Sequence, residues 1–127
     1  MTQEDKQLLL KDICARLPYK VKGVYARTDI KNLSICEITT HLYGEMEESF
    51  NGKEKYEFIP YLRPISSMTD EEQRTLDSMC NGVEMVSRLS GLKMFNKAFD
   101  WLNKNHFDYR GLIEKGLALD ATGFNIY

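Results

Sequence analysis

The sequence has few of the residues that build disulfide frameworks, zinc sites or histidine-based active sites. It contains three cysteines and two histidines in 127 residues, and none of them has the spacing of metal ligands. The isolated cysteines, Cys14, Cys36 and Cys80, are therefore predicted to be reduced packing residues of a cytoplasmic protein. We predict no metal and no cofactor.

Long hydrophobic runs are missing as well. The polar N-terminus is followed by only three consecutive leucines, far short of a signal-peptide core or of a membrane span of about 20 apolar residues. A Gly-rich phosphate loop, a nucleophile elbow and an HExxH motif are also absent from the sequence. The sequence thus predicts no membrane contact and carries no catalytic signature.

The composition that remains is typical of one globular domain covering residues 1–127. Hydrophobic residues make up 43% of the chain and charged residues 28%. The net charge of −2 is unevenly spread, because residues 1–31 carry seven Lys/Arg against four Asp/Glu whereas residues 32–72 carry three against nine. This asymmetry indicates either two polar faces of opposite charge or ordinary solvated charges.

The first half of the chain, residues 1–60, reads as one helix followed by strands. A helix is predicted from Gln3 to Arg16, with Thr2 as its N-cap and Pro18 as its stop. Alternating or β-branched patterns then predict strands at Lys20–Arg27, Ser34–Tyr43 and Glu54–Ile59. Gly44–Ser49 is predicted as a loop or a frayed strand edge, and Asn51-Gly52 as a hairpin turn. Pro60 is predicted either to end the last strand or to lie on an edge of the sheet.

The second half, about residues 69–127, reads as helical. Thr69 and Glu72 form a capping box that starts a helix, which breaks at Asn81-Gly82 or runs on to about Leu89. After a break at Ser90-Gly91, a helix is predicted at Lys93–Asn105, with Phe95, Ala98, Phe99 and Leu102 as the apolar stripe that packs on the core. A last short helix, capped by Asp108, is predicted at Tyr109–Lys115, before an extended tail that packs on the core. We therefore expect an α+β fold: an N-terminal helix, a small antiparallel sheet of three or four strands that could curl like a barrel, then two or three helices.

Protein binding is the first of three functional interpretations. Aromatic residues and arginine are enriched at the hot spots of protein interfaces, and several of them fall in the second half of the chain. The aromatic residues could equally well belong to the core and rim of a small domain. The candidate binding residues are Tyr61, Arg63, Trp101, His106, Tyr109 and Arg110.

Nucleic-acid binding is the second interpretation. Lys20, Lys22 and Arg27 lie on one predicted strand with Tyr25 between them, and a basic sheet face with an aromatic residue can stack bases. An ordinary basic strand face is the alternative, and the sequence pI of about 5.7 favours that alternative.

An enzyme is the third interpretation. His106 lies two residues from Asp108, and a histidine beside a carboxylate can act as a general acid or base. Alternatively, Asp108 caps a helix and His106 occupies a turn. The runs of carboxylates, such as Glu45, Glu47 and Glu48, are ordinary solvated residues or helix starts and add no support for catalysis.

Two segments carry a resemblance to a known group of proteins. Pro60-Tyr61-Leu62-Arg63-Pro64-Ile65-Ser66-Ser67-Met68-Thr69 and the segment from His106 to Ala118, His-Phe-Asp-Tyr-Arg-Gly-Leu-Ile-Glu-Lys-Gly-Leu-Ala, resemble segments of short uncharacterised proteins from prophages and mobile elements of gut Bacteroides-type bacteria. The resemblance covers about a quarter of the chain and implies a bacterial cytoplasm. It brings no activity, cofactor or catalytic residue. We expect a non-catalytic accessory protein with a protein partner, or with nucleic acid as the alternative.

Overall fold

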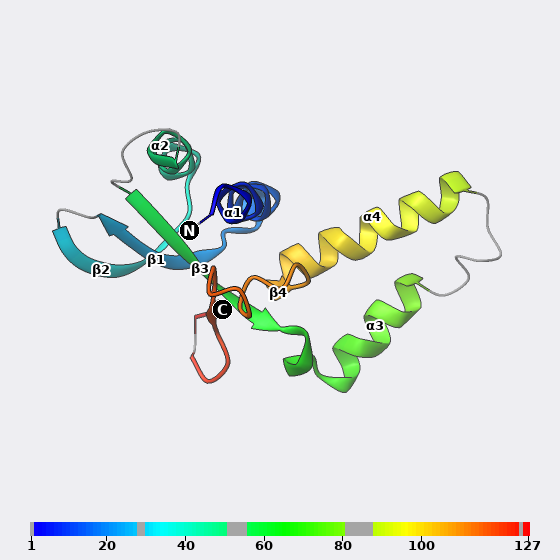
Figure 1. Ribbon diagram of the computed structural model, residues 1–127. Helices are drawn as coiled ribbons and strands as arrows, with labels where there is room; N and C mark the ends of the chain where they lie inside the picture. Colours follow the sequence, from blue (N-terminus) through cyan, green and yellow to red (C-terminus); the bar gives the residue numbers. More distant parts are fainter. Residues whose placement is uncertain (1, 28–29, 51–55, 81–87, 125) are drawn as a thin grey trace.

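The computed structural model describes residues 2–27, 30–50, 56–80, 88–124 and 126–127. Two helices pack beside each other against a small sheet, and two more helices run side by side away from it (Figure 1). The predicted α+β fold with an N-terminal helix is thus confirmed. The elements in chain order are α1 Gln3–Arg16, η1 Leu17–Tyr19, β1 Lys22–Arg27, β2 Ile30–Glu37, α2 Thr40–Phe50, β3 Tyr56–Pro64, η2 Ile65–Ser67, α3 Asp70–Cys80, α4 Arg88–Lys104, β4 Phe107–Asp108 and β5 Leu119–Asp120.

Helix α1 has the predicted bounds. The Thr2 side chain accepts a hydrogen bond from the Asp5 N–H at 3.1 Å, as an N-cap does. Pro18 ends α1 in a 3₁₀ turn, which Lys20 closes with a φ of 57°. Because Lys20 adopts this left-handed conformation, β1 begins at Lys22, two residues later than predicted.

Strand β1 lies at the centre of the antiparallel part of the sheet, between β2 and β3. Gly23 is paired with Pro60 of β3, and a Cβ atom on Gly23 would lie 2.6 Å from the Phe58 ring and 2.8 Å from Pro60 Cα. Only glycine allows β1 and β3 to approach this closely.

The strand predicted from Ser34 is confirmed as far as Glu37, but the predictions for residues 38–49 are wrong. The expected strand Ser34–Tyr43 is instead the end of β2 followed by helix α2, and the expected loop Gly44–Ser49 is helical. The Thr39 hydroxyl accepts a hydrogen bond from the Leu42 N–H at 3.1 Å, which caps α2 at its start. Met46 and Phe50, one helical turn apart, are buried. Burial of this helix face stabilises α2 by more than the glycine inside the helix destabilises it, and it overrides the alternating apolar pattern that favours a strand.

Strand β3 continues past the predicted end at Ile59 and runs through Pro60 to Pro64. Its second half pairs in parallel with β4 through Arg63 and with β5 through Tyr61 and Leu62. The main chain continues these pairs with hydrogen bonds from Arg63 N–H to His106 O at 2.7 Å and from Ala121 N–H to Leu62 O at 2.8 Å. The five-stranded sheet of the described residues is therefore mixed, and it is not closed into a barrel.

Helices α3 and α4 form an arm that leaves the sheet at the end of β3 (Figure 1). The predicted capping box starts α3: Glu72 N–H donates to the Thr69 hydroxyl at 3.1 Å, and Thr69 N–H donates to the Glu72 carboxylate at 3.0 Å. Ser90-Gly91, predicted to separate two helices, lies inside α4. Neither the predicted hairpin turn at Asn51-Gly52 nor the predicted break at Asn81-Gly82 falls within the described residues.

The predicted short helix Tyr109–Lys115 is replaced by turns. Asp108 still acts as a cap, since its two carboxylate oxygens accept the N–H groups of Leu112 and Ile113 at 2.9 Å each. A helix does not form here because Leu117 N–H donates to Leu112 O at 2.9 Å, which closes the turn. Gly116, whose φ is 74°, ends this turn.

The core lies between the sheet and the first two helices. The tail meets the prediction only in part, because Leu117 is buried and Leu119–Asp120 is extended, whereas turns follow and Phe124 is exposed. The buried side chains of the core include Leu9, Ile13, Val21, Phe58 and Leu62. The cysteines contribute little, since Cys36 is half-buried and Cys14 and Cys80 are exposed, against the predicted packing role.

No helix among the described residues has the length and apolar character needed to cross a membrane.

Candidate functional site

The two segments that carry the sequence resemblance lie against each other. Strand β3 pairs with β4 in the register Arg63 to Phe107 and Pro64 to Asp108. The Arg63 guanidinium lies 4.2 Å from the centre of the Phe107 ring, and Trp101 stacks on that ring with 5.7 Å between ring centres. Three predicted binding residues, Arg63, Trp101 and His106, are thereby brought together around the buried Phe107.

Arg63 also joins the sheet to the arm. Its two terminal nitrogens donate to the two carboxylate oxygens of Glu72 at 2.8 and 2.7 Å. Hydrogen bonding to Arg63, with smaller contributions from Thr69, lowers the pKa of Glu72 to about 2, against the opposing effect of burial. Glu72 is therefore charged at neutral pH, and the ion pair holds the first turn of α3 against the end of β3.

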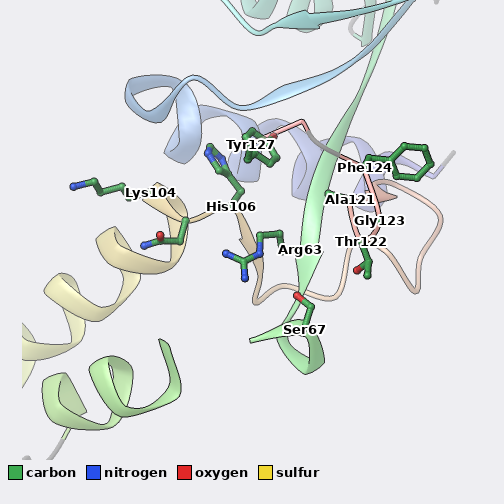
Figure 2. A pocket seen from close by; sticks show the side chains of 10 residues that line it. Arg63, Ser67, Lys104, His106, Ala121, Thr122, Gly123, Phe124 and Tyr127 are labelled. Carbon is green, nitrogen blue, oxygen red and sulfur yellow. The ribbon is translucent and has the colours of Figure 1, made fainter. Parts of the chain in front are cut away.

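A cavity of about 520 Å³ opens beside Arg63. Figure 2 shows Arg63 at its centre, with Lys104 at the α4 side and residues of the chain end on the other side. Arg63 and Lys104 are the charged side chains among the described residues of the lining, which include no Asp or Glu. We call this cavity the cationic pocket; its lining consists of Arg63, Ser67, Lys104, Asn105, His106, Ala121, Thr122, Gly123, Phe124 and Tyr127.

His106 lines the cationic pocket with a left-handed backbone conformation and a neutral side chain. Its backbone φ is 64°, which turns the chain sharply between α4 and β4. Burial, followed by the positive charges of Arg16, Arg63 and Lys22, lowers the pKa of its imidazole to about 4. His106 is thus neutral at pH 7, and its buried Nδ1 has no hydrogen-bond partner in the described part of the chain.

His106 and Asp108, the residues of the enzyme interpretation, do not form a hydrogen-bonded pair. Both Asp108 oxygens accept backbone N–H groups, and His106 Nδ1 is unpaired. The ring of His106 instead stacks on Tyr127, with 3.6 Å between ring centres and 11° between ring planes (Figure 2). The contacts of both residues therefore serve to hold the chain in place.

Tyr127 ties the chain end to the sheet. Its hydroxyl donates to Lys22 O at 3.1 Å and to Tyr61 O at 2.8 Å as alternative acceptors, and it accepts the Lys22 N–H at 2.8 Å. The Lys22 ammonium donates to Ile126 O at 2.9 Å. Lys22, a residue of the predicted nucleic-acid surface, is therefore engaged in holding the chain end.

The other predicted nucleic-acid residues do not complete a basic sheet face. Lys20 is exposed, but it lies before β1. Tyr25 donates a hydrogen bond to Glu45 at 3.0 Å, so its hydroxyl faces a carboxylate of α2. The backbone of Arg27 is at the end of β1, and its side chain lies outside the described part of the structure.

Tyr109 and Arg110 join a buried cluster rather than the cationic pocket. Asp12, fully buried, accepts two hydrogen bonds from Arg16, at 2.8 and 3.1 Å, and one from Arg110 at 3.5 Å. Arg16 also donates to Phe107 O at 2.6 Å, and its Nη1 has no partner among the described residues. The Tyr109 ring lies 5.3 Å from the Arg16 guanidinium and 4.9 Å from that of Arg110. Two arginines thus share one carboxylate, which leaves an excess positive charge beside Tyr109.

An exposed aromatic surface continues from Tyr109 along α4. Phe99 contacts Tyr109 with 5.3 Å between ring centres, and Phe95 lies one helical turn before Phe99. The exposed fractions of Phe95 and Phe99 are 44% and 47%, although both were predicted to lie on the buried stripe of this helix. Ala98 and Leu102 of the same stripe are buried. We call Phe95, Phe99 and Tyr109 the aromatic surface.

The sequence did not point to several residues of these sites. Lys104, Thr122 and Tyr127 were missed because they reach the pocket only through the pairing of β3 with distant segments. Arg16 reads as the basic last residue of a surface helix, and no local pattern indicates its burial. The spacing of Phe95 and Phe99 was visible, but it predicted a core position.

Tyr61, the remaining predicted binding residue, is half-buried and lies 5.9 Å from the Phe124 ring. In the described residues, no group of three His, Cys, Asp or Glu side chains is placed to hold a metal ion.

Comparisons with family models, with curated proteins and with solved structures gave no match to this chain.

Proposed function

We propose that this chain is a non-catalytic binding protein that docks a protein partner through the aromatic surface. Its exposed phenylalanines are the observation that carries the proposal. Phe95 and Phe99 keep nearly half of their surface in water on the same side of one helix, with Tyr109 beside them. Large apolar side chains gathered on a protruding helix are typical of sites where another protein binds.

The charge beside the aromatic surface specifies the partner further. Arg16 and Arg110 share the single carboxylate of Asp12, so this cluster carries one positive charge in excess. Arg110 keeps 20% of its side chain exposed. The proposed partner therefore presents apolar side chains next to a carboxylate, which would reach Arg110 when the apolar side chains cover the phenylalanines.

The biological setting is also a proposal. The two segments that resemble prophage and mobile-element proteins suggest an accessory protein of such an element, acting in the bacterial cytoplasm. Free Cys14, Cys36 and Cys80 are compatible with a reducing compartment. The nucleic-acid alternative has less support, because Lys22 is engaged with the chain end and Tyr25 with Glu45. The enzyme alternative also has less support, because His106 and Asp108 are not hydrogen-bonded to each other.

The test compares three versions of the full chain as bait in a lysate of the source cells, with and without nuclease treatment. The double variant Phe95→Ser/Phe99→Ser removes the aromatic surface, and Phe124→Ser is the matched control because Phe124 is 59% exposed and lies elsewhere. We expect a protein that the wild type and the control retain and the double variant loses. The direct affinity of that protein, once purified, should then fall in the double variant alone.

Three results would contradict the proposal. The same proteins could be retained by all three baits, or retention could disappear with nuclease treatment, which would favour nucleic acid. A wild-type dimer in light scattering that the double variant abolishes would instead assign the surface to a second copy of the chain. Circular dichroism of each bait checks that the variants are folded.

A further inference from the structure

We propose that the cationic pocket is a second binding site, which takes a small phosphate ester carrying an aromatic group. This site shares no residue with the aromatic surface and does not depend on the function proposed for that surface. The pocket residues were assigned above only to structural contacts, and the cavity they enclose remains to be explained. Its volume of about 520 Å³ is in the range of small-molecule sites.

The charges around the pocket favour an anion. Arg63 and Lys104 line it, and the positive charges of Arg16 and Lys22 act on its histidine. Arg63 has Glu72 as its partner and Arg16 has Asp12, whereas no ion pair of Lys104 is found in the described residues. The exposed carboxylate of Asp120 lies on β5 outside the lining, where it accepts the Thr122 N–H at 2.8 Å. The charged side chains among the described lining residues are therefore all positive.

The lining also offers donors suited to a phosphate group. The Arg63 guanidinium is fixed between the Phe107 ring and Glu72, and only two of its five N–H groups are used by Glu72. Lys104 can move its ammonium toward a ligand, whereas the Thr122 side chain, which also lines the pocket, is hydrogen-bonded to the Asp120 carboxylate. A fixed guanidinium with a mobile ammonium is a common arrangement for binding phosphate oxygens.

The opposite end of the pocket is apolar. The lining passes from Lys104 and Arg63 to Ala121, Gly123 and Phe124, which Figure 2 shows on the far side of Arg63. Phe124 is 59% exposed, although its ring contacts Tyr61. A ligand that fills the cavity would thus place its charged group near Lys104 and an apolar ring near Phe124.

The histidine supplies a reporter for occupancy. His106 is kept neutral by burial and by Arg16, Arg63 and Lys22, and its Nδ1 is buried without a partner in the described residues. Tyr127, stacked on its ring, is the other titratable group in contact with it. A phosphate in the pocket would offset part of the positive field, so the titration midpoint of the His106 imidazole should rise on binding.

The experiment titrates the full chain at pH 7 and low ionic strength with phenyl phosphate, inorganic phosphate and phenol. Calorimetry at this pH gives the affinities. NMR of the imidazole nitrogens over a separate pH series, with and without each compound, gives the titration midpoint of His106. We expect saturable binding of phenyl phosphate, weaker binding of inorganic phosphate and no binding of phenol. The midpoint of His106 should rise only in the presence of the two phosphates.

Matched variants locate the site. Lys104→Gln should weaken phenyl phosphate binding by at least about threefold. Lys97→Gln, on the same face of α4 two turns away and outside the lining, should leave it unchanged. Phe124→Ala should weaken binding of phenyl phosphate and spare that of inorganic phosphate. The double variant Phe95→Ser/Phe99→Ser should bind phenyl phosphate normally, which separates this proposal from the proposed function.

Several outcomes would overturn the inference. They are the absence of saturable phenyl phosphate binding, equal losses in Lys104→Gln and Lys97→Gln, or a His106 midpoint that does not move. Equal affinity for phenyl phosphate and inorganic phosphate would refute the aromatic part of the ligand, and equal affinity for phenyl phosphate and phenol would refute the anionic part.

Discussion

Replacing Glu72 by glutamine should loosen the joint between the sheet and the arm. The substitution keeps the shape of the side chain but removes the charge that Arg63 contacts at 2.8 and 2.7 Å. Fully exposed ion pairs contribute about 0.2–1 kcal/mol, and hydrogen bonds to charged groups about 1.5–3 kcal/mol. Because Arg63 and Glu72 are 26% and 21% exposed, we expect a loss of about 2 kcal/mol in the free energy of unfolding at pH 7.

The pH dependence of this loss identifies its source. The pKa of Glu72 falls from 4.5 to about 2 on folding, chiefly through its hydrogen bonds with Arg63. A lowered carboxylate pKa stabilises the fold fully above pH 4.5, and this stabilisation disappears as the pH falls through about 2. The full shift corresponds to about 3 kcal/mol, which screening by solvent reduces toward the 2 kcal/mol estimated from the contacts.

Urea unfolding of the wild type and the Glu72→Gln variant at pH 7, 4 and 2.5 measures this difference. Glu71→Gln is the control, because Glu71 is an exposed carboxylate of the same helical turn. It should cost only a few tenths of a kcal/mol through the helix dipole. Equal losses for the two variants at pH 7, or a Glu72→Gln difference that stays constant down to pH 2.5, would refute the assignment to the ion pair.

Three further predictions concern other parts of the fold. Folding lowers the pKa of His106 from 6.5 to about 4, so protonation of this imidazole destabilises the folded state. The free energy of unfolding of the wild type should therefore fall by about 1–2 kcal/mol as the pH falls from 6.5 to 4. The His106→Asn variant should lack this pH dependence in urea titrations. Gly23→Ala should unfold at a much lower temperature, since the new methyl group meets Phe58 and the β3 backbone, whereas Gly44→Ala, with open space around it in α2, should gain about 0.5–1 kcal/mol. Tyr127→Phe should cost about 1–2 kcal/mol by urea unfolding and raise amide exchange at Lys22, whose N–H would lose its acceptor.

Local signals in the sequence predicted the local structure well. The N-cap Thr2 and the stop at Pro18 gave the bounds of α1, and the capping box of Thr69 and Glu72 gave the start of α3. These features depend on groups at most a few residues apart. The strand prediction was wrong beyond Glu37, and the loop prediction for Gly44–Ser49 was wrong, because Leu42 fits an alternating pattern and a helical pattern alike. Only the packing of Met46 against the core decides between the two.

The candidate sites depended on contacts between distant residues, so the sequence predicted them in part. Arg63 and His106 were identified as candidate binding residues from their chemical type, and they do line one cavity. Their partners Lys104 and Tyr127 could not be found, because the parallel pairing of β3 with β4 and β5 has no signature in such short strands. The exposure of Phe95 and Phe99 was missed since a helical stripe does not show which part of it lacks a neighbour.

The division of β3 has a consequence for the order in which the molecule is completed during synthesis. Its first half pairs with β1, about 30 residues earlier in the chain, but its second half pairs with segments made some 45–60 residues later. The antiparallel strands β1, β2 and the first half of β3 can therefore assemble with the first two helices while the arm is still being translated. The edge of Tyr61–Pro64 stays unpaired in that interval, and the cationic pocket forms only when Tyr127 has left the ribosome.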